Sequence, residues 1–499
     1  MAKRFLLGYD IGSSFIKASL VDADTGLMVR SASSPDKEMK IDSPRGGWAE
    51  QHPDLWWSNV VAVTRKMFSA DPSFAGGVCA VGISYQMHGL VVTDTDQNIL
   101  RPSIIWCDSR AVAIGNKAFS EIGDGHCLKH FLNSPGNFTA SKLKWVKDNE
   151  PEIYKKIFKI MLPGDFVAMR LTGEVCTTIS GLSEGVFWDF QQRAVAGDIL
   201  EYYGFEPRMI PQIVPTFGVQ GKLTLKAASE LGLKKDIPVS YRAGDQPNNA
   251  YSLNVLNPGE VAATAGTSGV IYGVTAENLY DRASRVNAFA HVNYSDQRPN
   301  KGILLCINGT GIQYSWINHH LLDSRYTYDQ MNEMASAVPI GSDGLLCYPF
   351  GNGAERSLEN REVNGQFSGI SFNIHDKRHL IRAAQEGIAF SFRYGLDIMK
   401  EMGMEFNVIR AGDANLFKSR VFQEAIVHSC DVDLEIYDTD GAQGAARGSA
   451  VGAGIFSSHG DALRGVAART TVHRRHEMTS KYGSAYDRWK ADLARFLIS

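Results

Sequence analysis

The sequence predicts an α/β protein built from two large domains. The chain has 499 residues, which is too many for one hydrophobic core and favours two or three domains. Strand and helix patterns alternate along residues 5–105, as they do in α/β proteins. Two turns rich in glycine, serine and threonine lie roughly half a chain apart, each between apolar, strand-like runs.

The composition is that of a globular protein with small-molecule ligands. Hydrophobic residues make up 44% and charged residues 21% of the chain, and the formal net charge of −3 offers no footprint for nucleic acid or an anionic membrane. No apolar run approaches the roughly 18 residues of a membrane helix. The apolar N-terminal run is interrupted by Gly8 and Asp10, so it reads as a strand rather than a signal peptide. Seven scattered cysteines without a C-x-x-C pair indicate reduced thiols in a cytoplasmic protein.

The first turn is predicted to be the tip of a β-hairpin. Residues 5–7 lead into it and residues 15–21 lead away, so the two runs are expected to pair as antiparallel strands. A Walker loop, by contrast, ends in Gly-Lys-Ser or Gly-Lys-Thr and opens a helix. Small residues let backbone N–H groups approach a phosphate, hydroxyls add donors, and a carboxylate suits the cation of a nucleotide. The residues of this kind are Asp10, Gly12, Ser13 and Ser14, and Lys17 follows them in the same hairpin.

A second turn of the same composition lies in residues 263–269 and contains Gly266, Thr267 and Ser268. A single Gly-Ser turn is ordinary, and for one copy a structural role is the better explanation. Two copies, each leading into a strand, favour function. We therefore expect a nucleotide whose phosphates are clamped between the two halves of the chain.

The first half is predicted to contain helices packed on a sheet. The helix expected at 53–68 begins with Pro53, which suits a first turn, and it places Trp56 and Trp57 in the core. The further elements expected in order are strands at 78–83 and 89–93 and helices at 142–146 and 153–160.

A domain boundary is predicted within residues 210–260, where prolines separate short strands and turns. After it the strand, turn and strand of 260–274 repeat the start of the chain without an obvious sequence repeat. A long helix is expected at 376–402. A second helix, at 441–455, is rich in glycine and alanine, which lets two backbones pack closely. The predicted domains are residues 1–247 and 248–499.

Asp245 is the candidate general base. It follows the strand-like segment 240–244 and precedes the second hairpin, with Gln246 next to it. Phosphoryl transfer to an alcohol needs a base aligned with the hydroxyl, donors and metal on the phosphates, and exclusion of water. Gly-Asp followed by proline is also common turn chemistry. The position beside the second hairpin favours the catalytic interpretation.

Polar residues that follow other strand-like runs are candidates for ligand binding, since open α/β sheets bind ligands at strand ends. In Gln86-Met87-His88-Gly89, the polar side chains of Gln86 and His88 lie between two such runs and suit sugar hydroxyls, although a lone histidine is often structural. Trp106 follows another run; beside it, Asp108 and Arg110 form either a polar substrate wall or an ion pair that ties a loop.

The segment 410–415 follows a predicted strand at 407–409 and precedes a helix. Its small residues either admit an adenine ring or form only a tight turn between strand and helix. The candidate contacts are Gly412 and Asn415.

Together these segments resemble the FGGY family of carbohydrate kinases over nearly the whole chain. Residues 137–149 fit the first family signature except at Asn137, where glycine, serine or an aromatic residue is usual. Residues 365–386 fit the second signature, except that Gln385 replaces an apolar residue. The resemblance implies a two-domain actin/hexokinase-like ATPase fold, with ribonuclease H-like domains and an active site in the cleft between them.

The resemblance also implies roles for the candidates. Asp245 would deprotonate the sugar hydroxyl, and Asp10 would hold Mg²⁺ through water. The implied sugar contacts are Met87, His88, Trp106, Asp245 and Gln246. The implied nucleotide contacts are Gly12, Ser13, Ser14, Lys17, Gly266, Thr267, Ser268, Gly309, Gln313, Gly412 and Asn415. The adenosine motif departs from the family pattern, since Ala411-Gly412-Asp413 stands where Gly-Gly-Ala or Gly-Gly-Gly is common.

Within the family, the motifs are most similar to those of members that act on D-xylulose. The expected reaction is therefore phosphorylation of D-xylulose to D-xylulose 5-phosphate, with ATP and Mg²⁺. Gln246 stands where asparagine is usual, which leaves glycerol, ribulose, gluconate or another polyol as alternatives. A sugar-responsive regulator without turnover is the alternative of a different class. The expected partners are a sugar and ATP, without nucleic acid or membrane, and a homodimer is left open.

Overall fold

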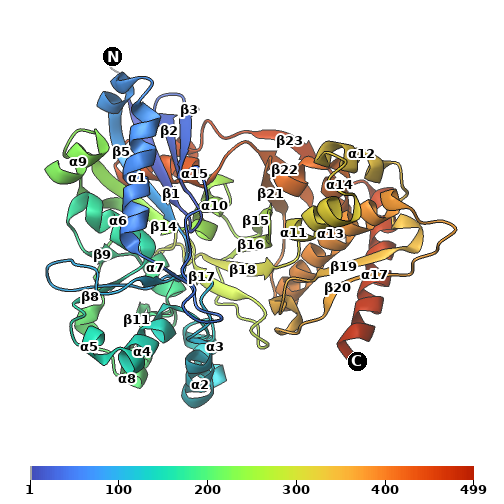
Figure 1. The fold of residues 1–499 in the computed structure, drawn as a ribbon, viewed down its shortest axis with the longest axis horizontal. Coiled ribbons are helices and arrows are strands. Elements are labelled where there is room, and N and C mark those ends of the chain that lie inside the picture. The colour runs from blue at the N-terminus through green and yellow to red at the C-terminus, as the bar shows by residue number, and fades with distance from the viewer. Residues whose placement is uncertain (1–2, 499) are drawn as a thin grey trace.

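The computed structural model describes residues 3–498 and shows two lobes, each built on one large sheet (Figure 1). The first lobe is blue to green in the figure, and the second is mostly yellow to red. Within the described residues, every helix is too short or too polar to cross a bilayer.

The first lobe contains a six-stranded sheet. Its strands in sheet order are β13 (Phe217–Lys222), β14 (Pro238–Gly244), β5 (Val78–Tyr85), β1 (Phe5–Ile11), β2 (Ile16–Asp22) and β3 (Met28–Ser34). β1 and β2 form the predicted antiparallel hairpin, while β1, β5 and β14 run parallel. The carboxyl ends of these three strands therefore meet at one edge, and the chain segments that follow them carry the candidate residues.

The second lobe contains a seven-stranded sheet. Its strands in sheet order are β17 (Asn287–Ala290), β18 (Lys301–Ile307), β16 (Gly269–Thr275), β15 (Glu260–Ala265), β21 (Val408–Gly412), β22 (Asp433–Tyr437) and β23 (Ala468–Val472). β15 pairs antiparallel with β16 and parallel with β21, which is parallel to β22. Each sheet thus has an antiparallel hairpin beside two further parallel strands, which confirms the predicted restart of the pattern.

Helices cover both sheets. The principal ones are α1 (Pro53–Phe68), α4 (Thr139–Asn149), α6 (Pro163–Thr172), α7 (Ile179–Glu184), α10 (Asp245–Ser252), α11 (Gly311–Trp316), α12 (Tyr328–Ser336), α13 (Lys377–Glu401), α14 (Arg420–Cys430), α15 (Gly441–Gly452) and α17 (His476–Ile498). The other helices are α2 (Val112–Ile122), α3 (Asp124–His130), α5 (Pro151–Tyr154), α8 (Gly197–Tyr203), α9 (Leu225–Leu231) and α16 (His459–Ala462). The short strands are β4 (Glu50–Gln51), β6 (Val91–Thr93), β7 (Ser103–Ile104), β8 (Lys159–Met161), β9 (Cys176–Thr177), β10 (Trp188–Asp189), β11 (Ala194–Val195), β12 (Gln212–Ile213), β19 (Leu346–Phe350) and β20 (Asn364–Ser368).

Helix α1 has the predicted bounds and the predicted core face. Pro53 occupies the first turn, where its missing N–H costs no hydrogen bond. Trp56 is fully buried and donates its indole N–H to Gln51 Oε1 at 3.0 Å. Trp57 is nearly buried and donates to Glu230 Oε2 at 2.7 Å. Both tryptophans therefore hold the helix against the first sheet with their polar atoms paired.

The prediction of a helix at 153–160 is wrong. Only α5 (Pro151–Tyr154) is helical there, and Lys159–Met161 form β8, which pairs antiparallel with β6. The Phe158 N–H donates to the Thr93 carbonyl at 2.8 Å. Pro163 follows closely, and the residue before a proline is disfavoured in helical conformation, so an extended approach to α6 is the local preference as well.

Helix α15 belongs to the second half of the chain but packs on the sheet of the first lobe, where it contacts β1, β5 and β14 (Figure 1). A Cβ on Gly8 would lie 1.9 Å from the Ala442 carbonyl oxygen, and a Cβ on Gly82 would lie 1.9 Å from that of Ala445. Glycine is therefore required on the strands for this close approach. The predicted close packing of the glycine- and alanine-rich helix is confirmed.

Candidate active site

Two carboxylates meet where the parallel strands of the first lobe end. Asp10 lies near the end of β1, and its Oδ1 accepts a hydrogen bond from Ser84 Oγ on β5 at 2.8 Å. Asp245 is the first residue of α10, directly after β14. Burial raises the pKa of Asp245 to about 7, with the charge of Asp10 adding to the shift. Asp245 therefore has the pKa of a general base that works near neutral pH.

The pKa of Asp10 is also raised by burial, against the opposing effects of the Ser84 hydrogen bond and the Lys17 charge. Asp440 adds a further negative charge from the N-terminus of α15. Gly441 follows it, and a Cβ there would lie 2.7 Å from Asp10 Oδ2. The start of α15 thus approaches Asp10 closely because residue 441 is glycine.

These oxygen donors fit a hard cation such as Mg²⁺, which prefers carboxylates, phosphates and water. Within residues 3–498, no group of three or more His, Cys, Asp and Glu side chains is placed to hold a metal by itself. A cation beside Asp10 would therefore take most of its ligands from water and from a bound phosphate group. This is the usual manner of magnesium binding at nucleotide sites.

The tip of the first hairpin is held by its carbonyl groups. Gln51 Nε2 donates to the Ser13 carbonyl at 2.7 Å, and the Met39 N–H donates to the Ser14 carbonyl at 2.9 Å. The backbone N–H groups of Ser13 and Ser14 have no acceptor among the described residues. Gly12 donates its own N–H to the Phe15 carbonyl at 3.1 Å. The tip therefore presents free donors of the kind that bind an anion.

Met87 and His88 follow β5 at the same edge. Met87 is buried, whereas His88 is half-buried with a backbone φ of 61°. His88 Nδ1 lies 2.9 Å from the Glu184 carbonyl oxygen, so Nδ1 carries the proton and Nε2 is left as an acceptor. The ring packs at 4.9 Å from that of Phe138 and at 5.3 Å from that of Phe289, which belongs to the second lobe. Burial lowers the pKa of His88 to about 3, so the imidazole is neutral.

Lys142 is a structural support whose role sequence reasoning missed, since it was visible only as one position of a family signature. It is fully buried on α4, and its Nζ donates to the carbonyls of His88 at 2.9 Å and Ile105 at 3.0 Å. Burial lowers the pKa of Lys142 to about 7. The lysine thus fixes the left-handed backbone of His88 to the chain just ahead of Trp106.

Of the two interpretations of Asp108 and Arg110, the structure shows the ion pair that ties a loop. Arg110 pairs with Asp108 at 2.7 Å and with Glu50 at 2.7 Å, and its guanidinium lies 3.8 Å from the ring centre of Trp48. These contacts tie the loop. Trp106 itself is 53% exposed, and its indole N–H lies 3.4 Å from Ser13 Oγ beside the first hairpin.

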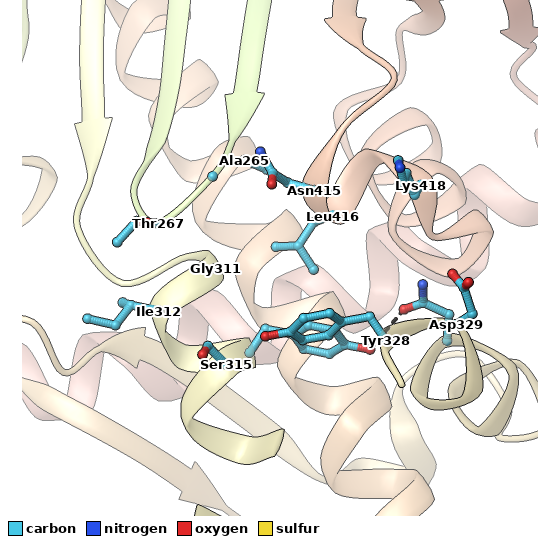
Figure 2. A pocket seen from close by; sticks show the side chains of 13 residues that line it. Ala265, Thr267, Gly311, Ile312, Ser315, Tyr328, Asp329, Asn415, Leu416 and Lys418 are labelled. Atoms are coloured by element: carbon cyan, nitrogen blue, oxygen red, sulfur yellow. Dashed lines mark hydrogen bonds between the residues drawn. The ribbon is translucent and has the colours of Figure 1, made fainter. Parts of the chain in front are cut away.

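A cavity of about 640 Å³ lies beside the second hairpin (Figure 2). Of the predicted nucleotide contacts, Gly266, Thr267 and Asn415 line it. The other lining residues are Ala265, Gly311, Ile312, Tyr314, Ser315, Tyr328, Asp329, Asn332, Leu416 and Lys418. Figure 2 shows Tyr328 and Asp329 on one side of this space and Ala265 and Asn415 on the other.

Four predicted nucleotide contacts of the second lobe do not line the cavity: Ser268, Gly309, Gln313 and Gly412. A Cβ on Gly309 would lie 1.3 Å from the Pro349 carbonyl oxygen, so packing alone requires glycine there. Gln313 donates its amide N–H to Cys347 Sγ at 2.9 Å. Gly412 ends β21, and a Cβ on it would have no neighbour closer than 3.8 Å, which keeps that surface flat and open. Ser268 stands at the end of the turn before β16.

The cavity wall contains a pair of tyrosines that sequence reasoning missed. Tyr314 on α11 and Tyr328 on α12 stack with ring centres 5.7 Å apart and an angle of 22°. Their spacing in the sequence follows no motif, because the two helices come together only in the folded lobe. Stacked aromatic rings offer a flat apolar surface to a planar ligand.

Family models match both halves of this chain. The model of the N-terminal domain of the FGGY family of carbohydrate kinases matches residues 5–251, and the model of its C-terminal domain matches residues 261–456.

Similar proteins span the whole chain. The xylulose kinase of Bacillus subtilis is 26% identical over 495 residues, which cover 98% of this chain and 96% of that protein. The xylulose kinase of Escherichia coli is 25% identical, with 96% of each covered. The crystal structure of xylulose kinase from Rhodospirillum rubrum superposes with a TM-score of 0.87 at 25% identity, covering 99% of this chain and 100% of that one. Plasmodium falciparum glycerol kinase with ADP has a TM-score of 0.89 at 18% identity, with 100% and 99% covered, and shows the same fold.

Proposed function

This chain belongs to the FGGY family of carbohydrate kinases, and from that premise we propose that it transfers the γ-phosphoryl group of ATP to the C5 hydroxyl of D-xylulose. The observation that carries the proposal is the placement of Asp245. It lies at the start of α10 beside Asp10, half-buried, with a pKa of about 7. Relatives named xylulose kinase support the choice of sugar.

In the proposed reaction Asp245 accepts the proton of the sugar hydroxyl. The hydroxyl oxygen forms the new bond to the γ-phosphorus, while the bond from that phosphorus to the bridging oxygen of ADP breaks and its electron pair leaves with ADP. The base must lie within hydrogen-bond distance of the hydroxyl, and α10 fixes the position of Asp245 by holding it in its first turn. The neutral His88 accepts a hydrogen bond at Nε2 and orients the sugar without competing for the proton.

The phosphates would lie between the two hairpins. Free N–H groups at Ser13 and Ser14 suit them on one side, and the turn at Gly266 and Thr267 suits them on the other. Asp10 would hold Mg²⁺ through water, and this cation neutralises phosphate charge when bound. The adjacent cavity would take the adenosine.

The two lobes would close on the bound substrates and exclude water. The ring of His88 already packs against Phe289 of the second lobe, so the sugar end of the cleft is bounded by both lobes. We further propose that the two domains of the chain are residues 1–247 and 248–499, with α15 of the second domain packed on the sheet of the first lobe. The alternatives are another polyol or sugar acid as acceptor, or a regulator without turnover.

The test is ADP release measured with ATP across D-xylulose, ribulose, glycerol and gluconate. We expect the largest kcat/KM with D-xylulose; a larger value with another acceptor would replace D-xylulose by that acceptor. Asp245→Asn should abolish turnover, because an amide cannot accept the proton. Asp96→Asn, in an exposed loop, is the matched control and should leave turnover unchanged. Sugar binding by the wild-type protein without any turnover would favour the regulator.

A further inference from the structure

Gln385 departs from the family signature, and its side chain is hydrogen-bonded to residues of the cavity wall. It lies on α13 and is fully buried, behind the wall of the cavity beside the second hairpin. A buried amide needs hydrogen-bond partners for its donor and its acceptor, since an orphaned polar group costs stability. An apolar residue would fill this position without that requirement.

The partners of Gln385 reach the cavity wall directly. Its Nε2 donates to the hydroxyl of Tyr314 at 2.8 Å and to Asn332 Oδ1 at 2.9 Å. The Tyr314 hydroxyl donates to the same Asn332 oxygen at 2.8 Å. Tyr314 and Asn332 both line the cavity. One buried amide therefore fixes two side chains of the wall.

The orientation of the Gln385 amide follows from the start of α14. Ser419 is the N-cap of that helix, and its Oγ accepts the Phe422 N–H at 3.4 Å. The Ser419 hydroxyl is nearly buried, and its proton goes to Gln385 Oε1 at 2.6 Å. Because Oε1 faces the serine, Nε2 must face Tyr314 and Asn332.

The same reasoning fixes Asn332. Its Oδ1 receives two hydrogen bonds, so its Nδ2 must point the other way. Asn332 is half-buried, and its Nδ2 has no acceptor among residues 3–498. The cavity wall thus carries a hydrogen-bond donor of fixed direction beside the stacked rings of Tyr314 and Tyr328.

We propose that Gln385 is a positioning residue for the nucleobase: it holds the Asn332 amide so that Nδ2 donates to a ring nitrogen of adenine in the cavity. The inference rests on the proposed use of ATP. Adenine offers unprotonated ring nitrogens as acceptors and a flat face for the tyrosine pair. Tyr328 and Leu416 line the space on which the base would lie (Figure 2). A role in packing alone would instead be met by leucine at position 385.

The experiment measures the Kd of MgADP by calorimetry, and the KM values of ATP and sugar, for three single variants and one double variant. Asn332→Asp keeps the shape and replaces the donor by an acceptor, so we expect the Kd of ADP to rise about tenfold. Gln385→Leu should raise it about fivefold, because Asn332 is then free to rotate. The double variant Gln385→Leu with Asn332→Ala should bind ADP no more weakly than Asn332→Ala alone, since Gln385 acts through Asn332. The KM of the sugar should stay within twofold in all of them.

Ser391→Ala is the matched control. It removes a buried hydroxyl from the same helix, and among residues 3–498 that hydroxyl bonds only to the Ile388 carbonyl. It should leave the Kd of ADP unchanged. An unchanged Kd of ADP in Asn332→Asp overturns the proposal, and so does an additive double variant. Asn332 is half-buried, so its aspartate variant is expected to fold even where Gln385→Leu does not. If no sugar is phosphorylated the proposed function fails, yet the ADP measurements still decide this inference.

Discussion

In the proposed mechanism, burial of Asp245 would serve catalysis at the expense of stability. The pKa of this carboxyl is raised to about 7 by burial and by Asp10, whereas an aspartate in the unfolded chain has a pKa near 3.9. Folding therefore disfavours the ionised form that the base requires. If Asp245 is the base, its raised pKa should affect two measurable quantities: the pH dependence of turnover and the melting temperature.

The first signature is the pH dependence of turnover. Because only the ionised Asp245 can accept a proton, we expect kcat/KM to fall as the pH drops below about 7, with one acidic limb near that value. A pH profile of kcat/KM for the sugar, at saturating ATP, checks this. An acidic limb near pH 4 would show that the carboxyl has an ordinary pKa and contradict the structural explanation.

The second signature is the stability of Asp245→Asn. A raised pKa in the folded state gives a stability contribution that is complete below pH 4 and is lost as the pH rises to about 7. The asparagine variant avoids this loss, so we expect it to melt several degrees higher than the wild type at pH 8 and at nearly the same temperature at pH 4. Calorimetry at both pH values measures the difference. An equal difference at both would mean that ionisation is not the cause.

Prediction from sequence reached polar groups near strand ends, such as Asp10 and Asp245, because parallel strands end at one edge of a sheet. It did not reach Asn332 and Tyr314. Their orientation depends on Gln385 and Ser419, whose contacts span 34 to 71 residues and follow no local period. Side-chain networks of this kind arise only after helices have packed.

Among the elements, α15 fits closely against the first sheet. Its backbone carbonyls lie where a Cβ on Gly8 or Gly82 would be, so the helix and the sheet touch through their backbones. Such contact leaves no room for relaxation, since backbone atoms on both sides would have to move.

Gly82→Ala tests this packing. The new Cβ would lie 1.9 Å from the Ala445 carbonyl oxygen, and we expect the free energy of unfolding to fall by roughly 3 kcal/mol. Gly46→Ala is the control and should change stability little, because in the described part of the chain no atom beyond the adjacent residues lies within 4 Å of its Cβ position. Urea denaturation of both variants gives the comparison. A loss below about 1 kcal/mol for Gly82→Ala would mean that the helix shifts without cost.

The elements that sequence reasoning predicted well are those with a strong local signal. The two hairpins, α1 and the long helix α13 have clear periodicity or turn residues, and each is found where expected. The segment 153–160 failed because its conformation depends on β6, which lies some 60 residues earlier in the chain. Local propensity carries no information about such a partner.

Across the whole molecule, β17 joins the second lobe to the first beside His88, at the proposed sugar end of the site. Asn133 donates to the Ala288 carbonyl at 2.6 Å and accepts its N–H at 3.0 Å. Ser183 Oγ accepts the Ala290 N–H at 2.9 Å. Phe289 lies between these two anchors and packs on His88. The actin/hexokinase-like arrangement inferred from the family motifs is confirmed by the similar structures, although the sequence itself does not show how the lobes are tied.

Asn133→Ala tests the coupling between the lobes. It leaves both backbone groups of Ala288 without their side-chain partner in a buried place, so we expect a loss of roughly 2–4 kcal/mol in stability. The KM of the sugar should rise more than the KM of ATP, because Phe289 and His88 lie at the sugar end. Steady-state kinetics with each substrate varied provide the measurement; Asn98→Ala, in an exposed turn, is the control. Equal changes in both KM values would contradict a local effect.

The placement of α15 also determines when the first lobe can finish folding during synthesis. Its sheet is made early, yet the helix that covers one face of β1 and β5 is translated about 190 residues after the N-terminal family match ends. At ordinary rates of translation this gap lasts roughly 10 to 40 seconds. Throughout that interval the nascent sheet lacks its cover, so its apolar face is open to aggregation and to chaperones. A fragment that stops before residue 441 retains this uncovered face permanently.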